Sequence, residues 1–106
     1  MIATMIRAEF YGSKGLLTGF RFSGHSGYAE SGSDIVCAAF SSAVQLTANL
    51  LDEFGFSPDI TVEDNLIECR VEPDKDASRM LNQLRLHFES ISEEFPNTIN
   101  ITISEV

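Results

Sequence analysis

A histidine and a cysteine stand at the two ends of a loop rich in glycine and serine, GHSGYAESGSDIVCAAFSSA (residues 24–43). His25 precedes Cys37 by twelve positions, and a loop of that length can fold back to bring the imidazole beside the thiol. An imidazole that accepts the thiol proton activates cysteine as a nucleophile. A helical pattern begins near Asp34, so we expect Cys37 within the first turn, where unpaired amides and the helix dipole favour the thiolate. The spacing predicts a Cys-His catalytic pair.

Two further polar residues belong to the same stretch. Asp34 could orient or charge-stabilise the imidazole, which is the third role in a catalytic triad. Ser41 lies one helical turn after Cys37, so it shares the face of that cysteine and could hydrogen-bond near the site. Backbone amides at the helix start, at Cys37 or Ala38, are candidates for an oxyanion hole that meets the negative charge developing on an attacked carbonyl.

Structural explanations compete with each of these assignments. Free cysteines are commonly buried, so Cys37 could simply pack in the core, and His25 could be a surface turn residue. Cys69 alternates with apolar neighbours in a predicted strand, which indicates a core position. His87 lies in the middle of a predicted helix and is expected to be partly exposed there.

The elements that must position these residues follow from the hydrophobic periodicity. Two-residue alternation predicts strands, three-to-four-residue spacing predicts helices, and glycine, proline and asparagine mark turns. The predicted order is a strand at 2–10, a turn at 11–15, a strand at 16–23, a loop at 23–33, a helix at about 34–54, a hairpin at 60–71 with its turn at 63–65, a helix after Pro73 and Asp74, and a strand at 99–103. This β-β-α-β-β-α-β order favours one α+β domain over residues 1–106, a two-layer sandwich with two helices packed on a mixed or antiparallel sheet.

Capping and apolar spacing define the first helix further. Ser33 or Asp34 is a suitable N-cap, because a short side-chain oxygen can accept from the free amides of the first turn. Gly55 is a natural stop. The predicted apolar face consists of Ile35, Ala39, Ala43, Leu46, Leu50 and Phe54.

Composition limits the possible partners. The chain has 106 residues, sixteen acidic against seven basic, and a formal net charge of −9. With no basic stripe, direct binding to nucleic acid is not expected, whereas the acidic surface either maintains solubility or attracts a basic protein. No apolar run approaches the roughly 18 residues needed to span a membrane, and the N-terminus resembles a strand, not a signal peptide. We therefore expect a cytoplasmic protein with two free thiols, and its small core makes dimerisation plausible.

The loop and the helix start resemble the signature of the ribosomal-processing cysteine protease family, Prp. The matching residues are Gly24-His25, the run Gly32-Ser33-Asp34-Ile35-Val36-Cys37-Ala38, and Ser41, and the length and element order of the whole chain also fit. Ser26 stands where the family often has alanine, which leaves the chemistry undisturbed.

The resemblance implies a function. Prp proteases remove an N-terminal extension from large-subunit ribosomal protein twenty-seven, act as homodimers, and need no metal or cofactor. Carried onto this chain, Cys37 is the nucleophile, His25 is the general base and acid, and Asp34 and Ser41 support them. The loop that covers the substrate would include Gly24, Ser26, Gly27, Gly32 and Ser33.

Two other functions remain open from the sequence. The first is a non-catalytic acidic binding module that associates with ribosomal proteins or assembly factors. The second is a redox sensor that uses Cys37, although no obvious resolving cysteine accompanies it.

Overall fold

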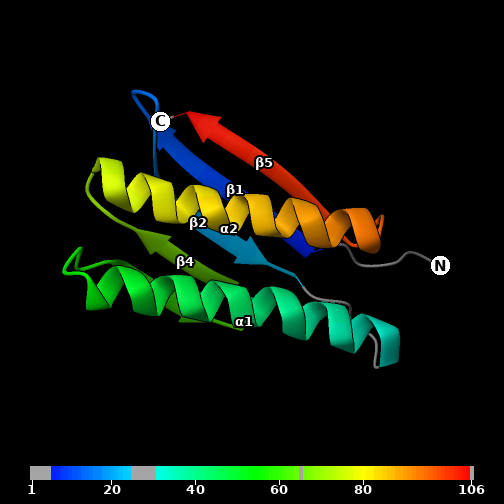
Figure 1. The fold of residues 1–106 in the computed structure, drawn as a ribbon. Coiled ribbons are helices and arrows are strands. Elements are labelled where there is room, and N and C mark those ends of the chain that lie inside the picture. Colours follow the sequence, from blue (N-terminus) through cyan, green and yellow to red (C-terminus); the bar gives the residue numbers. More distant parts are fainter. Residues whose placement is uncertain (1–5, 25–30, 65, 106) are drawn as a thin grey trace.

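The chain folds into one layer of helices on one layer of strands. The computed structural model describes residues 6–24, 31–64 and 66–105, with residues 31–35 as backbone. Both helices cover the same face of the sheet (Figure 1). The elements are β1 (Ile6–Ser13), β2 (Leu16–Ser23), α1 (Ser31–Glu53), β3 (Asp59–Glu63), β4 (Leu66–Arg70), α2 (Lys75–Glu94) and β5 (Ile99–Glu105). The predicted fold class and element order are confirmed.

The five strands form a mixed sheet in the order β3-β4-β2-β1-β5. Three neighbouring pairs are antiparallel, whereas β1 and β5 run parallel, with Ile6 opposite Ile99. The parallel pair places the first and last described strands side by side (Figure 1). The β3–β4 hairpin therefore forms one edge of the sheet, and β5 forms the other.

The first hairpin has a tighter turn than the sequence predicts. We expected a turn at 11–15, but β1 continues to Ser13 and β2 begins at Leu16. Lys14 and Gly15 alone connect the strands, with φ angles of 55° and 84°. Two successive positive φ angles match the twist of the flanking strands, which is why a Lys-Gly pair suffices here.

Aromatic side chains fill the space between the helices and the sheet. Phe10, Phe20 and Phe22 extend from the first hairpin, and Phe40 and Phe88 extend from α1 and α2. The rings of Phe40 and Phe88 meet edge to face, with centroids 5.0 Å apart, so the core joins both helices directly. Such pairs stabilise a core by about 0.5–1.5 kcal/mol beyond burial alone.

The apolar face of α1 differs from the predicted one. The buried stripe is Val36, Phe40, Val44, Ala48 and Leu51. The predicted stripe lies on a neighbouring side, where Leu46 and Phe54 are 60% and 61% exposed. The helix carries two apolar stripes, and periodicity cannot decide which one meets the sheet.

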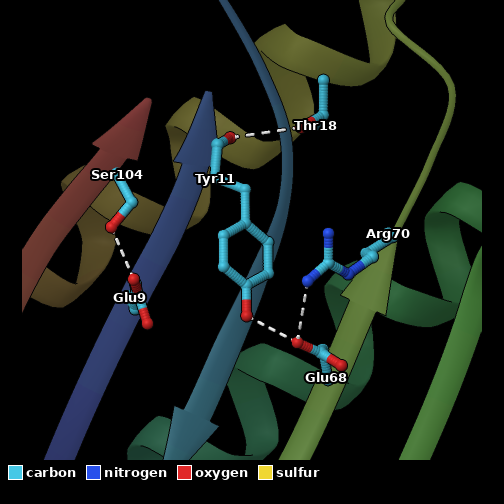
Figure 2. A network of polar contacts seen from close by, with 6 residues as sticks. All are labelled: Glu9, Tyr11, Thr18, Glu68, Arg70 and Ser104. Atoms are coloured by element: carbon cyan, nitrogen blue, oxygen red, sulfur yellow. Dashed lines mark hydrogen bonds and ion pairs between the residues drawn. The ribbon is translucent and has the colours of Figure 1, made fainter. Parts of the chain in front are cut away.

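Polar side chains occupy the opposite face of the sheet (Figure 2). The Tyr11 hydroxyl donates a 2.5 Å hydrogen bond to Glu68, and the Arg70 guanidinium lies 4.2 Å from the centre of the Tyr11 ring. Gly19 lies in register between Tyr11 and Arg70. Because Gly19 has no side chain, the two residues can meet across β2.

Candidate active site

Cys37 lies on the side of α1 that faces the β3–β4 hairpin. Its neighbours Val36 and Phe40 are buried in the core and anchor this part of the helix. Cys37 and Ser41, one helical turn apart, are both half-buried at the edge of that core. The packing therefore holds the thiol at the boundary between core and surface.

A pocket of about 200 Å³ opens beside the thiol. Cys37 and Ser41 form its helical side, and Gly24 lies at the end of β2. The remaining wall, mostly apolar, consists of Phe22, Val62, Glu63, Leu66 and Ile67. A soft nucleophile at an apolar pocket can react with a carbonyl carbon whose neighbouring groups occupy the hollow.

The structure brings together three of the residues predicted for the site. Cys37, Ser41 and Gly24 line one pocket, although Gly24 and Cys37 belong to different elements. Gly24 has a φ angle of 72°, which favours glycine, and it directs the chain as it leaves β2. The residue that follows it in the sequence is His25.

The other predicted residues fall into two groups. His25, Ser26 and Gly27 lie outside the described residues, so their predicted roles stay predictions. Gly32, Ser33 and Asp34 belong to the first turn of α1, because the helix begins at Ser31. The predicted loop is therefore too long at its C-terminal end, and neither Ser33 nor Asp34 is the N-cap.

The earlier helix start changes the position of Cys37. We expected it at the third helical position, but it is the seventh residue of α1. In an α-helix, the amide of such a residue bonds to the carbonyl four residues back. The amides of Cys37 and Ala38 therefore belong to the helical ladder, and the free amides lie in the preceding turn. The predicted oxyanion hole at Cys37 and Ala38 is wrong for this arrangement.

The wall of the pocket is not evident from the sequence pattern. Val62 and Ile67 are opposite each other in the β3–β4 register, on the side of the sheet that faces the helices. The alternating pattern of this hairpin indicates that both side chains share a face. Only the three-dimensional arrangement shows that this hairpin lies beside Cys37.

The second cysteine is a core residue, as predicted. Cys69 in β4 is fully buried. Burial, together with the charge of Asp59, raises the pKa of the Cys69 thiol to about 11. At neutral pH this thiol stays protonated, which makes it a poor nucleophile.

Other features of the described surface lack the chemistry of the Cys37 pocket. Two of the larger hollows, of about 560 and 770 Å³, extend along the helices. The first contains His87 beside Met80 and Leu84, and His87 is exposed, as expected. Within residues 6–24, 31–64 and 66–105, no group of three histidine, cysteine or acidic side chains could hold a metal ion. No helix of the described part is long and apolar enough to cross a membrane.

Comparisons with known proteins extend these observations. The family model described as cysteine protease Prp matches residues 5–100. The chain is similar in fold to an essential ribosomal processing protease Prp from Staphylococcus aureus, which was solved in complex with a substrate peptide. The TM-score is 0.83 and the sequence identity is 24%, and the match covers 94% of this chain and 100% of the other. It is also similar to SMU.848 from Streptococcus mutans, with a TM-score of 0.80 and 25% identity, covering 96% of each chain. No curated protein matches the sequence.

Proposed function

This chain belongs to the cysteine protease Prp family, and from that premise we propose that it removes the N-terminal extension of large-subunit ribosomal protein twenty-seven during ribosome maturation. The observation that carries the proposal is the half-buried Cys37 in a pocket that it shares with Ser41 and Gly24. A structural core cysteine would resemble Cys69, which is fully buried.

The proposed reaction is acyl transfer through a thioester. His25 accepts the proton of Cys37, and the sulfur attacks the scissile carbonyl carbon to form a tetrahedral intermediate. As the intermediate collapses, the C–N bond breaks and His25 gives its proton to the departing amine. Water, activated by His25, then attacks the thioester and releases the second product with the free thiol. No step requires a metal or a cofactor.

The supporting residues have smaller proposed roles. Asp34 orients or charge-stabilises the imidazole, and Ser41 hydrogen-bonds within the pocket. The role proposed for Ser41 is supported by its place in the pocket wall, one helical turn from Cys37. The glycine- and serine-containing stretch from Ser26 to Ser33 lies between the base and the nucleophile in the sequence, and we assign it to substrate binding.

The charge of the chain supports a basic partner. With a formal net charge of −9, the protein attracts a positively charged ribosomal protein precursor more strongly than a nucleic acid. The same charge disfavours direct contact with nucleic acid. We also propose a cytoplasmic protein that forms a single protease domain over residues 1–106 and does not bind a membrane.

A homodimer completes the proposal. Leu46 and Leu50 of α1, together with Phe54 directly after the helix, form an exposed apolar stripe, which we call the outer stripe of α1. Leu46 and Leu50 also line the 560 Å³ hollow between the helices. Apolar stripes of this kind on a small domain favour association, and a second copy of the chain would cover the outer stripe.

Cleavage of a synthetic peptide tests the proposed activity. The peptide spans the extension junction of the ribosomal protein from the source organism, and mass spectrometry identifies the products under reducing conditions. We expect a single cut that Cys37→Ala and His25→Ala each slow by about a thousandfold or more. Cys69→Ala is the matched control, because it removes a thiol that has no catalytic neighbour, and it should retain cleavage.

Three results would contradict the proposal in different ways. Cleavage that survives Cys37→Ala would remove the nucleophile assignment. Cleavage that survives His25→Ala would remove the assigned base. Binding of the peptide without any cut by the unmodified protein would favour the non-catalytic binding module.

A further inference from the structure

The edge strand β3 combines two properties that bear on substrate binding. Among the described residues β3 pairs only with β4, and all five of its residues, Asp59–Glu63, are exposed. Its residues Val62 and Glu63 also line the pocket that contains Cys37. The other edge strand, β5, contributes no residue to that pocket. One edge of the sheet is therefore continuous with the candidate active site.

The hydrogen-bond pattern shows which backbone groups of β3 point outward. The amide of Val71 donates to the carbonyl of Thr18, so the backbone amide and carbonyl of Val71 point toward β2. Successive residues of a strand direct these groups to opposite sides, so the backbone amides and carbonyls of Cys69 and Ile67 also point toward β2. Their partners in the β3 register are Ile60 and Val62, which consequently direct their amides and carbonyls away from β4.

Those outward groups are well placed to bind an extended peptide. Proteins commonly block exposed edges with bulges, inward charges or proline, because a free edge accepts another strand. The β3–β4 register runs without a bulge from Asp59 to Glu63, and Pro58 lies before the strand. The side chains of Ile60 and Val62 are 42% and 69% exposed, so an added strand would gain apolar contacts as well as hydrogen bonds.

The charge at this edge favours one kind of occupant. Asp59, Glu63 and Asp64 are exposed on the same hairpin. Carboxylates at a binding edge attract basic peptides and repel acidic ones. The edge therefore fits an extended segment of a basic protein.

We propose that the substrate peptide binds as an added strand on β3, hydrogen-bonded to the backbone of Ile60 and Val62, with the scissile bond beside Cys37. This inference rests on the proposed protease function and specifies how the substrate is held. Neighbouring strands lie about 4.8 Å apart, so an added strand passes next to the pocket wall formed by Val62. Peptide side chains would then alternate, with every second one directed toward the pocket side of the sheet.

Single N-methylation along the substrate peptide tests the proposal without changing the protein. The probe is the extension-junction peptide, methylated at one backbone nitrogen at a time, with the scissile amide left unmodified. In an added strand, alternate amides donate to β3 and the others point away. We expect KM to rise about tenfold at alternate positions and to change less than twofold at the positions between them.

A pair of proline variants tests the same contact from the side of the protein. Val62→Pro removes an outward amide and leaves the bonds between β3 and β4 in place. The matched control is Ile103→Pro on β5. The amide of Ile6 donates to the carbonyl of Thr98, so alternation directs the Ile103 amide away from β1. We expect about a tenfold rise in KM for Val62→Pro and no change for Ile103→Pro.

The outcomes separate this inference from the proposed function. If the unmodified peptide is cut but the rise in KM on N-methylation does not alternate along the peptide, strand addition on β3 is wrong and the protease assignment stands. If the unmodified peptide is neither bound nor cut, the proposed function itself fails. Should Val62→Pro not fold, the N-methylated peptides decide the question on the unmodified protein.

Discussion

The two cysteines of this chain show how environment decides the chemistry of one residue type. Cys37 is half-buried at a pocket, whereas Cys69 is fully buried between the sheet and the helices. Burial raises the pKa of Cys69 to about 11, so only about one molecule in ten thousand carries that thiolate at pH 7. Access and ionisation therefore both disfavour reaction at Cys69.

We predict that iodoacetamide at pH 7 alkylates Cys37 at least about a hundredfold faster than Cys69. Peptide mass spectrometry of samples taken over time gives both rates in the folded protein. Cys37→Ala should abolish the fast reaction, and unfolding in urea should bring the two rates together. Equal rates in the folded protein, or faster labelling of Cys69, would show that Cys37 is not an accessible nucleophile.

At the residue scale, the family match supports the reaction class, whereas the residues that carry it stay predictions. The spacing of His25 and Cys37 predicts a catalytic pair, and the match to the cysteine protease Prp family supports a cysteine protease without testing that pair. The predicted position of Cys37 in its helix was wrong, because Gly32 and Ser33 are typical of loops and yet belong to α1. Helix propensity is a weak prior at such positions, since tertiary packing can extend a helix through them.

At the element scale, one polar cluster connects strands that are not neighbours. Tyr11 of β1 reaches Glu68 of β4 across β2, and Arg70 bonds to the same carboxylate at 3.3 Å (Figure 2). Burial, followed by the hydrogen bond to Glu68, raises the pKa of Tyr11 to about 12. The same hydrogen bond is the main cause that lowers the pKa of Glu68 below its usual value of 4.5.

We predict that Tyr11→Phe lowers the free energy of unfolding at pH 7 by about 1.5–3 kcal/mol, the usual contribution of a hydrogen bond to a charged group. The folded state holds the tyrosine proton more tightly, so the contribution of Tyr11 is present below pH 10 and is lost as pH rises toward 12. The contribution of Glu68 is present above pH 4.5 and is lost as pH falls below it.

Urea unfolding of both proteins between pH 3 and pH 11 measures this difference. The gap in free energy of unfolding between wild type and Tyr11→Phe should be largest near neutral pH and should shrink at both extremes. Ser104→Ala serves as a control, because it removes a hydrogen bond to Glu9 on the same face and leaves Tyr11 and Glu68 paired. A gap that stays constant across the whole range would mean that the hydrogen bond contributes nothing and that only packing changed.

The elements themselves were largely predictable, and their partners were not. Alternation identified both hairpins and the final strand, because half-buried strands repeat every two residues. Periodicity alone could not distinguish the two apolar stripes of α1, since both repeat at helical spacing. It also could not show that β5 pairs with β1, because register between distant strands depends on the packed core.

At the scale of the whole molecule, charge and exposed apolar surface act in opposite directions. Each copy has a formal net charge of −9, so two copies repel each other at low ionic strength. The outer stripe of α1 favours association, because Leu46 and Phe54 are each about 60% exposed. At 0.1 M, added salt screens the repulsion between charges that lie more than about 10 Å apart, and it should therefore strengthen a dimer.

We predict that the protein is a dimer at micromolar concentration. Leu46→Glu should raise the dissociation constant of the dimer by about a hundredfold or more, because it places a carboxylate in the apolar contact. Sedimentation equilibrium over a range of concentrations gives the dissociation constant at low and moderate salt. The matched control is Ile103→Glu, an equally drastic change at a site 55% exposed on β5, and it should leave the dimer intact. A monomeric wild-type protein would contradict the homodimer. Dissociation by Ile103→Glu, with Leu46→Glu still dimeric, would move the interface from the helices to the β5 edge.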